Sequence, residues 1–323
     1  MRATAAAFIA LLFLNSFAGA QTQAPAGSEE LQEAARLDAE VVNLFGRGKY
    51  DEAAPLAERV LEIRLKAFGP AHPGVADAQY NLGMVRIGQG KFAEAEAVLR
   101  QALAVYEQAP PAADPARAKV LAGLALARVR QGHEDEALKL SAAALAAAEQ
   151  AFGVEGKEVA DYSRQLADLY RLKGDYGKAE AAYLRAIKIW TVSAGRDDAR
   201  VETAVERLMC MAADNRRRVG PKVSDLLDEI DPVKGIVLNG KAISKPAPSY
   251  PAEAKSGGIQ GGVVVKVWVD ETGAVTRLNA VCGHPVLAKA SVEAARRARF
   301  SVTTLDGKPA KVTGYITYNF VLR

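Results

Sequence analysis

A block of six residues occurs four times in this chain at a fixed spacing. The copies are GKYDEA, GKFAEA, GHEDEA and GDYGKA, and they begin at Gly48, Gly90, Gly132 and Gly174, each 42 residues after the one before. Three equal intervals without an insertion indicate one structural unit repeated in tandem. An alanine stands five residues after each glycine, where a small side chain lets two helices approach closely around a glycine turn. The sequence therefore predicts a series of stacked helical hairpins.

The repeat resembles the tetratricopeptide family, in the 42-residue form found in kinesin light chains. The loop at residues 68–73 is similar to that form, and Phe152 and Gly153 repeat its first two residues further along the chain. The resemblance implies an all-α solenoid over residues 21–218 that ends in a closing helix within residues 199–218. Each hairpin depends on its neighbours, because no single repeat buries its own apolar face.

In such an array the first helices of the hairpins line a concave groove. The resemblance implies three groove positions in each of three repeats. The third set is polar and charged, and contact with solvent alone is the alternative explanation for its polar character. These positions are Asp77, Tyr80 and Met84, then Lys119, Ala122 and Leu126, then Asp161, Arg164 and Asp168. We expect a protein partner to bind there, with candidate contacts at Tyr80, Met84, Arg164 and Asp168.

Residues 1–20 are arranged like a secretory signal peptide. A basic Arg2 precedes a 13-residue apolar run, and the small residues Ala18, Gly19 and Ala20 end the segment. This layout is typical of a signal that is cleaved on export. The alternative is a retained membrane anchor, which normally needs about 20 apolar residues. We therefore expect a mature protein that begins at Gln21.

The chain contains two cysteines, Cys210 and Cys282. After export both would lie in an oxidising compartment, where disulfides form and persist. A bond between them would join the closing helix to the C-terminal domain. Because spacing alone does not bring two backbones within bonding distance, we favour two separate buried thiols and keep the disulfide as the alternative.

The hydrophobic pattern changes after a predicted linker at residues 219–235. Alternating valines at residues 263–269 are followed by a turn at residues 270–273 and by a returning segment at residues 275–282, which predicts a β-hairpin. A helical pattern follows at residues 285–299, and a second alternating run ends the chain. The order β-β-α-β predicts a small α+β domain over residues 236–323, so the whole chain is an α+β multidomain protein.

The C-terminal domain also carries an ordered set of short motifs. Tyr250-Pro251 precedes a short helix, Gly258-Ile259-Gln260-Gly261 precedes the first strand of the hairpin, and Gly283-His284-Pro285 precedes the helix. This set resembles the C-terminal domain of the TonB energy-transducer family. The resemblance implies a periplasmic domain of a Gram-negative bacterium that binds a peptide of an outer-membrane transporter as an added strand.

By this resemblance the last strand is the docking edge, with Tyr250 and Pro251 close to it. An open edge also accepts a second copy of the same chain, so a homodimer through this strand is a further expectation. The candidate contacts in the strand are Thr313, Tyr315, Thr317 and Asn319.

Other classes of function lack support in the sequence. Residues 236–323 hold 12 Lys and Arg against 5 Asp and Glu, but without the basic stripe and interleaved aromatics of a nucleic-acid site. His72, His133 and His284 are scattered and show no metal-ligand spacing. The glycines at residues 257–262 are followed by no lysine at phosphate-loop spacing. We therefore predict no metal, no cofactor, no nucleic-acid partner and no catalytic residue.

These observations favour a non-enzymatic periplasmic interaction module. It would bind one envelope protein by strand addition and a second through the repeat groove, and would contact a membrane only through partners or an uncleaved N-terminus. The alternative is an energy-transducing component of a TonB-type outer-membrane transport system that keeps its N-terminal anchor. Three departures argue against that role: the N-terminus has the layout of a cleaved segment and contains no histidine, a solenoid replaces the family's proline-rich spacer, and Ala247 stands where the family has a polar contact residue.

Overall fold

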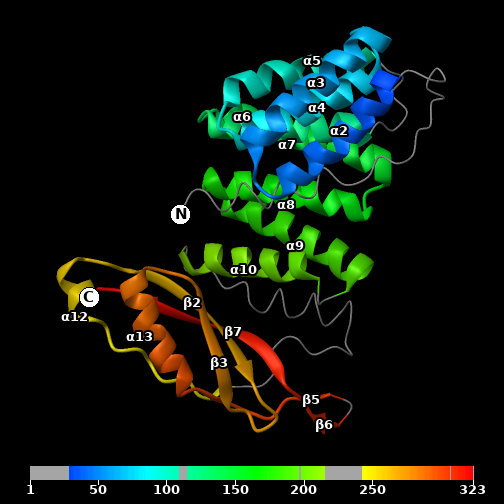
Figure 1. The fold of residues 1–323 in the computed structure, drawn as a ribbon. Helices are drawn as coiled ribbons and strands as arrows, with labels where there is room; N and C mark the ends of the chain where they lie inside the picture. Colours follow the sequence, from blue (N-terminus) through cyan, green and yellow to red (C-terminus); the bar gives the residue numbers. More distant parts are fainter. Residues whose placement is uncertain (1–28, 109–114, 196–197, 215–241, 306, 323) are drawn as a thin grey trace. The chain divides into compact units, whose positions relative to one another are not determined.

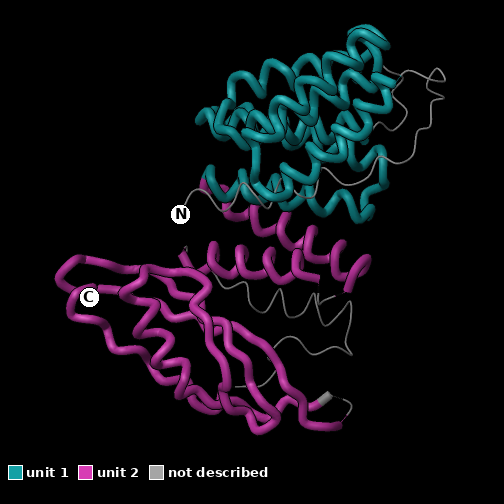
Figure 2. Tube along the Cα trace, in the orientation of Figure 1, with its two compact units in different colours: residues 1–173 teal, residues 174–323 magenta. Residues whose placement is uncertain are grey.

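The computed structural model describes residues 29–108, 115–195, 198–214, 242–305 and 307–322. The chain divides into two compact units, residues 1–173 and residues 174–323 (Figure 2). The predicted signal segment and the predicted linker lie outside the described residues, so both remain predictions.

Paired helices of nearly constant length make up the first unit and the start of the second (Figure 1). In the first unit they are α2 (Glu29–Gly46), α3 (Tyr50–Phe68), α4 (Pro73–Gly88), α5 (Phe92–Gln108), α6 (Pro115–Arg130), α7 (Glu134–Phe152) and α8 (Lys157–Leu172). The second unit begins with α9 (Tyr176–Ala194) and α10 (Ala199–Asp214). From α5 to α10, each helix begins 42 residues after the corresponding helix of the preceding repeat. The predicted helical repeat is therefore confirmed.

The repeat glycines form the turn inside each hairpin because the backbone there is left-handed. Gly48, Gly90, Gly132 and Gly174 have φ angles of 71°, 78°, 85° and 77°. In the first three of these turns the N–H of the residue after the glycine donates to the carbonyl five residues earlier, as from Lys49 to Leu44 at 2.9 Å. This is the Schellman pattern that ends a helix, and a residue with a Cβ would be strained in it.

Small residues allow the helices of each hairpin to pack closely. The alanines five residues after each turn glycine, Ala53, Ala95, Ala137 and Ala179, are all fully buried. In α4, a Cβ built on Gly83 would lie 2.6 Å from Cγ of Leu99, a fully buried residue of α5. The predicted role of small residues at the hairpin interface is confirmed.

The C-terminal part of the second unit is built around a three-stranded antiparallel sheet with the order β3-β2-β7. The ladder between β2 and β7 runs without a shift from Gly261 opposite Phe320 to Val269 opposite Val312. Helix α13 packs on one face of this sheet, which confirms the predicted α+β fold. The elements are β1 (Ala242–Ser244), α12 (Ala252–Ser256), β2 (Gly261–Val269), β3 (Val275–Cys282), α13 (Pro285–Arg296), β4 (Arg299–Phe300), β5 (Thr304–Leu305), β6 (Lys308–Pro309) and β7 (Val312–Phe320).

The core of this domain lies between the sheet and α13. It contains the four alternating valines of β2, together with Leu287 of α13 and apolar residues of β7. Unlike a half-exposed strand, β2 is buried on its second face as well, at Val264 and Lys266. Burial on both faces requires a second covering element.

That element is α10, which packs against β2 on the face opposite to α13. A Cβ built on Gly262 would lie 2.6 Å from the backbone oxygen of Ala213, so this glycine permits the close approach of helix and strand. At the border of the sheet, Cys210 of α10 is bonded to Cys282 of β3. The sequence interpretation of two separate thiols was wrong, because the docking of α10 brings together cysteines 72 residues apart.

Candidate functional site

The first candidate site is the outer edge of β7. Strand β2 pairs with one side of β7, and within the described residues no strand pairs with the other side. Even-numbered residues such as Ile316 and Phe320 point into the core beneath α13. An edge strand anchored in this way presents backbone N–H and C=O groups to any extended chain that approaches it.

The four candidate residues of this strand alternate with the core residues. The side chains of Thr313, Tyr315, Thr317 and Asn319 therefore lie on the α10 side of the sheet, and Asn319 is exposed. In the ladder Tyr315 stands opposite Lys266. A strand added to β7 would meet these side chains on one of its faces.

A side chain already uses the outer edge at one point. Nζ of Lys245 donates to the carbonyl oxygen of Thr317 at 2.9 Å and lies 5.1 Å from the centre of the Tyr318 ring. Burial of this ammonium lowers the pKa of Lys245. Because alternate residues of an antiparallel edge strand direct both backbone groups outward, Thr317 is one of the residues available for pairing.

The Tyr-Pro pair lies next to the end of β7. The Tyr250 hydroxyl donates to the carbonyl of Ile259 at 2.7 Å, and its ring packs edge-on against Phe320 with 5.3 Å between the ring centres. Pro251 is the N-cap residue of α12. These contacts hold the segment that contains Lys245 near the docking edge.

The hydroxyl of Tyr315 is engaged within the chain. It donates to Oε1 of Glu206 in α10 at 3.5 Å, and Nζ of Lys266 lies 3.4 Å from the same oxygen. Burial raises the pKa of both Tyr315 and Glu206. Sequence reasoning missed Glu206, although it stands 42 residues after Arg164 and so continues the series of groove positions.

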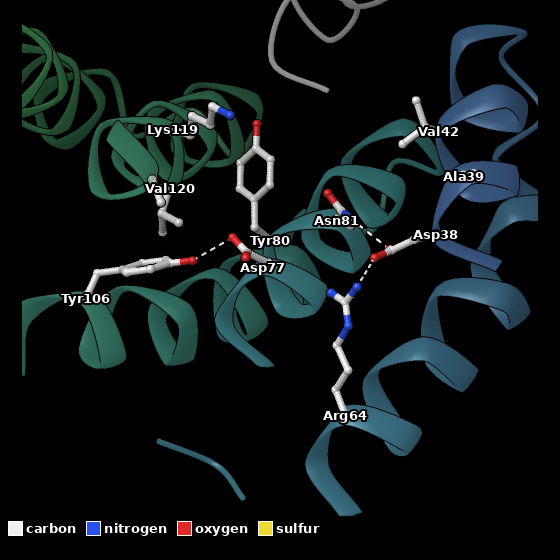
Figure 3. Close-up of a pocket in the computed structure, with 11 residues that line it drawn as sticks. Asp38, Ala39, Val42, Arg64, Asp77, Tyr80, Asn81, Tyr106, Lys119 and Val120 are labelled. Atoms are coloured by element: carbon white, nitrogen blue, oxygen red, sulfur yellow. Dashed lines mark hydrogen bonds and ion pairs between the residues drawn. The ribbon is translucent and has the colours of Figure 1, made fainter. Parts of the chain in front are cut away.

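The second candidate site is a cavity of about 250 Å³ in the helical repeats of the first unit (Figure 3). It brings together three of the groove positions expected from sequence, Asp77, Tyr80 and Lys119. Residues from α2 to α6 form its wall. The full lining is Asp38, Ala39, Val42, Arg64, Asp77, Tyr80, Asn81, Tyr106, Ala116, Lys119 and Val120.

Most of the polar groups of this cavity are held by one another. Asp38 accepts hydrogen bonds from Arg64 and, at 3.2 Å, from Nδ2 of Asn81. The Tyr106 hydroxyl donates to Oδ1 of Asp77 at 2.7 Å. Burial raises the pKa of Asp77, and the hydrogen bond from Tyr106 opposes that shift. This network gives the cavity a fixed polar wall.

The Tyr80 hydroxyl differs from its neighbours. It is buried and has no hydrogen-bond partner among the described residues. Figure 3 shows it extending to the same side of the cavity as the Lys119 side chain. Burial lowers the pKa of Lys119, and Asp77 opposes that shift. A buried hydroxyl without a partner is a group that a bound molecule can satisfy.

The other candidate groove residues lie elsewhere. Met84 is only 1% exposed and belongs to the core of the repeats. Nη1 of Arg164 donates to Oδ2 of Asp168 at 3.1 Å, and both side chains are largely buried. None of the three lines the cavity. They remain predicted contacts without a cavity around them.

Sequence reasoning missed several lining residues, but the repeat register could have found two of them. Asp38 precedes the expected Tyr80 by 42 residues, and Val42 precedes the expected Met84 by the same interval. The missed pair Arg64 and Tyr106 lies on α3 and α5, the second helices of their hairpins, whereas the expectation concerned first helices alone.

The part of the chain that the structure describes shows neither a metal centre nor a membrane-spanning helix. No group of three or more histidine, cysteine, aspartate or glutamate side chains there is arranged to hold a metal ion. None of the helices in these ranges combines the length and the apolar character needed to cross a membrane.

Comparison with protein families matches both parts of the chain. One tetratricopeptide repeat profile matches residues 39–108 and 116–191, and a second matches residues 80–142. The profile described as Gram-negative bacterial TonB protein C-terminal matches residues 246–322. The chain carries tetratricopeptide repeats followed by a TonB C-terminal domain. Both are interaction domains, so this is a protein-interaction module related to TonB-type systems with protein partners.

Solved structures similar to this chain are repeat proteins. A variant of the nearly identical TPR-like repeats of a putative kinesin light chain from Podosopora anserina has a TM-score of 0.52 at 20% identity, covering 63% of this chain and 95% of that one. A second structure of those repeats has a TM-score of 0.49 at 21% identity, covering 62% and 92%.

BtubC (BKLC) from P. vanneervenii has a TM-score of 0.43 at 18% identity, covering 64% of this chain and 75% of that one. At these identities the first likeness shows the repeat fold and nothing about partners. The search of curated proteins found no match. Helix α10 lies outside the residues matched by either family.

Proposed function

We propose that this protein joins two other proteins in the periplasm of a Gram-negative bacterium. The TonB C-terminal domain binds an extended segment of an envelope protein as a strand added to the outer edge of β7. The tetratricopeptide repeats bind a second protein through their groove. The single observation that carries the proposal is the outer edge of β7, which pairs with no strand among the described residues. There the Lys245 ammonium donates a hydrogen bond to the carbonyl oxygen of Thr317, which a neighbouring strand would otherwise use.

Strand addition suits this edge because it combines two sources of recognition. Backbone hydrogen bonds, each worth about 0.5–1.5 kcal/mol, supply affinity for any extended segment. Side chains on alternating faces supply selectivity, with Asn319 exposed on the α10 side. The partner that we propose for this edge, from the resemblance to the TonB family, is a peptide of an outer-membrane transporter.

Three observations support a periplasmic location. Residues 1–20 are arranged like a cleaved signal, and the matched profile describes Gram-negative bacterial proteins. The bond between Cys210 and Cys282 suits an oxidising compartment. The intact mass of protein expressed in a Gram-negative host tests this: a mature N-terminus at Gln21 supports the proposal. An unprocessed chain in the membrane fraction favours the anchored energy transducer instead.

The cavity of the repeats supports a separate binding role. Its volume suits one side chain of a partner rather than a whole segment, so the cavity serves as one anchor point along the groove. Tyr80 supplies a hydroxyl for that anchor, and the polar wall around it orients the bound group. The protein acts by binding, and we assign no catalytic step to either domain.

Site-specific photo-crosslinking tests the docking edge. A photoreactive residue at Asn319, which is exposed in β7, should capture an envelope protein in living cells. The matched control is the same residue at Lys289, which is exposed on α13 away from the edge. Equal capture from both positions, or capture from Lys289 alone, would exclude the edge as the docking site.

A further inference from the structure

Helix α10 carries two stripes of different character. Val201, Ala204, Val205 and Leu208 form a buried apolar stripe at helical spacing, on the side away from the sheet. Glu202, Glu206, Cys210 and Ala213 form the other stripe, which faces the sheet. Because α10 also packs against α9, the apolar stripe ties it to the last helical hairpin, whereas a polar stripe ties it to the TonB domain.

The two faces of the sheet also differ in polarity, as the two stripes of α10 do. Between the sheet and α13 lies a dry core of valines, Leu287, Ile316 and Phe320. On the α10 face, Lys266 is 7% exposed at its side chain and pairs with both Glu202 and Glu206, and Thr313, Tyr315 and Thr317 surround it. The larger apolar core of the domain therefore lies under α13, whereas the α10 face is mainly polar apart from Val264 and the close contact of Gly262 with Ala213.

A polar interface of this kind gains little from its ion pairs. Burial lowers the pKa of Lys266 and raises the pKa of Glu206, so removal from water disfavours both charges. The attraction between buried charges roughly offsets that desolvation rather than exceeding it. The groups that face Lys266 are Glu202 and Glu206 from α10, Tyr315 from β7 and Arg277 from β3. These ion pairs by themselves therefore add little to the docking of α10 on the sheet.

The disulfide between Cys210 and Cys282 also holds α10 on the sheet, and both of its cysteines lie near solvent. Strand β3 is an edge of the sheet, and both Cys210 and Cys282 are partly exposed. The docking of α10 is intramolecular in either redox state, and the bond between residues 72 positions apart shortens the connection and so raises the effective concentration of α10 at the sheet. A dithiol can approach such a bond from the border of the sheet.

We propose that the Cys210–Cys282 disulfide is a thiol-exchange site whose redox state decides whether α10 stays on the sheet. A thiolate of a dithiol reductant attacks one sulfur, a mixed disulfide forms, and the other cysteine leaves as a thiolate that takes up a proton. The second thiol of the reductant then releases the first cysteine. Two electrons pass to the protein, and the reductant becomes a disulfide.

In the reduced protein α10 remains packed on α9 and separates from the TonB domain. The surface that opens contains the buried Lys266 and the partly buried Trp268, with Nζ of Lys266 5.2 Å from the Trp268 ring centre. Arg277, 4.5 Å from the same ring centre, is exposed while α10 is docked and borders this surface. A disulfide oxidant closes this surface again: it takes two electrons from the two cysteine thiols by the same exchange and is itself reduced to a dithiol. The disulfide thus sets whether the strand-binding domain is fixed to the last helices of the repeats or is free of them.

Lysine labelling of the full-length protein tests the proposal. Dithiothreitol should raise the labelling rate of Lys266 by an amine-reactive ester at least tenfold, while that of exposed Lys289 stays unchanged. The double variant Cys210→Ser, Cys282→Ser should show the fast rate with or without dithiothreitol. Amide exchange along the ladder of β2 and β7 distinguishes undocking of α10 from unfolding, because undocking leaves those amides protected.

Three results would overturn the proposal. In the first, Lys266 labels slowly after the bond is reduced, which means that α10 stays docked without it. In the second, the bond reacts with dithiothreitol only after denaturant is added, which makes it a buried structural bond. In the third, β2 amides lose protection on reduction, which means that the domain depends on α10 to fold.

Discussion

Nζ of Lys245 lies 2.9 Å from the carbonyl oxygen of Thr317, so a side chain holds a hydrogen-bonding position that an added strand needs. The contact marks Thr317 as a residue whose backbone groups face away from β2. It also covers part of the edge in the free protein, since the ammonium occupies a backbone acceptor that an added strand would use. A partner strand must displace this ammonium in order to bind.

The edge can be tested by removing one backbone donor. Thr317→Pro deletes an outward N–H, and proline is tolerated on an edge strand where that group faces solvent. We expect capture of the edge partner to weaken about tenfold or more, because at least one hydrogen bond is lost and the ring obstructs pairing. Thr317→Val keeps both backbone groups and should bind normally. Equal loss in both variants, measured by crosslinking yield, would point to the side chain instead.

Tyr80 should matter for binding in the groove and not for stability. Tyr80→Phe removes a buried hydroxyl that has no partner among the described residues, so the free energy of unfolding should stay constant or rise by up to about 1 kcal/mol. Affinity for the groove partner should fall about fivefold, measured by titration calorimetry. Tyr106→Phe is the matched control, because its hydroxyl binds Asp77 and its loss should destabilise the fold by about 1 kcal/mol. Unchanged affinity of the Tyr80→Phe variant would remove this hydroxyl from the site.

Asp77 should make the stability of the repeats depend on pH. Burial raises its pKa above the ordinary value of 3.8, so the folded state favours the protonated carboxyl. The protonated carboxyl therefore contributes to the stability of the repeats. This contribution is fully present at pH values below the pKa that Asp77 has in the unfolded chain, and it is lost as the pH rises through the higher pKa of the folded protein. Asp77→Asn cannot ionise and keeps an oxygen to accept from Tyr106. We expect it to raise the unfolding temperature by roughly 2–4 °C near pH 8 and less near pH 4. Thermal unfolding followed by circular dichroism would contradict this if the gain were the same at both pH values.

Gly83 should tolerate no side chain. A Cβ there would lie 2.6 Å from Cγ of Leu99, which is fully buried and has no free space to move into. We expect Gly83→Ala to destabilise the repeats by about 1–3 kcal/mol in urea unfolding. Gly177→Ala in α9 is the control, since no atom lies within 4 Å of the added Cβ and alanine favours the helix by up to about 1 kcal/mol. A neutral Gly83→Ala would mean that α4 and α5 pack less tightly than the structure shows.

Patterns among residues close together in the sequence were enough to predict the helical hairpins and strand β2. The 42-residue interval located the hairpin turns, because a turn glycine with positive φ and a small residue on the facing helix are requirements of each repeat by itself. The alternating valines identified β2 in the same way. The 42-residue interval also predicted groove positions in successive repeats, and applying it once more, backwards from Tyr80, would have identified Asp38.

The cavity shows where such reasoning stops. Arg64 and Tyr106 lie on the second helices of their hairpins, yet they line the cavity beside residues of the first helices. Nothing in their own segments marks them as polar groups of a shared wall. Their partners, Asp38 and Asp77, are 26 and 29 residues away in sequence.

The sequence by itself determined the helical repeat, the small α+β domain and the strand that forms the open edge, since periodicity and turn chemistry are set by neighbouring residues. Tertiary structure decided that Cys210 bonds Cys282, that Glu206 meets Lys266 and Tyr315, and that α10 covers the second face of the sheet. These contacts join residues between 60 and 109 positions apart. Their formation depends on how packed elements dock, and no local pattern encodes that distance.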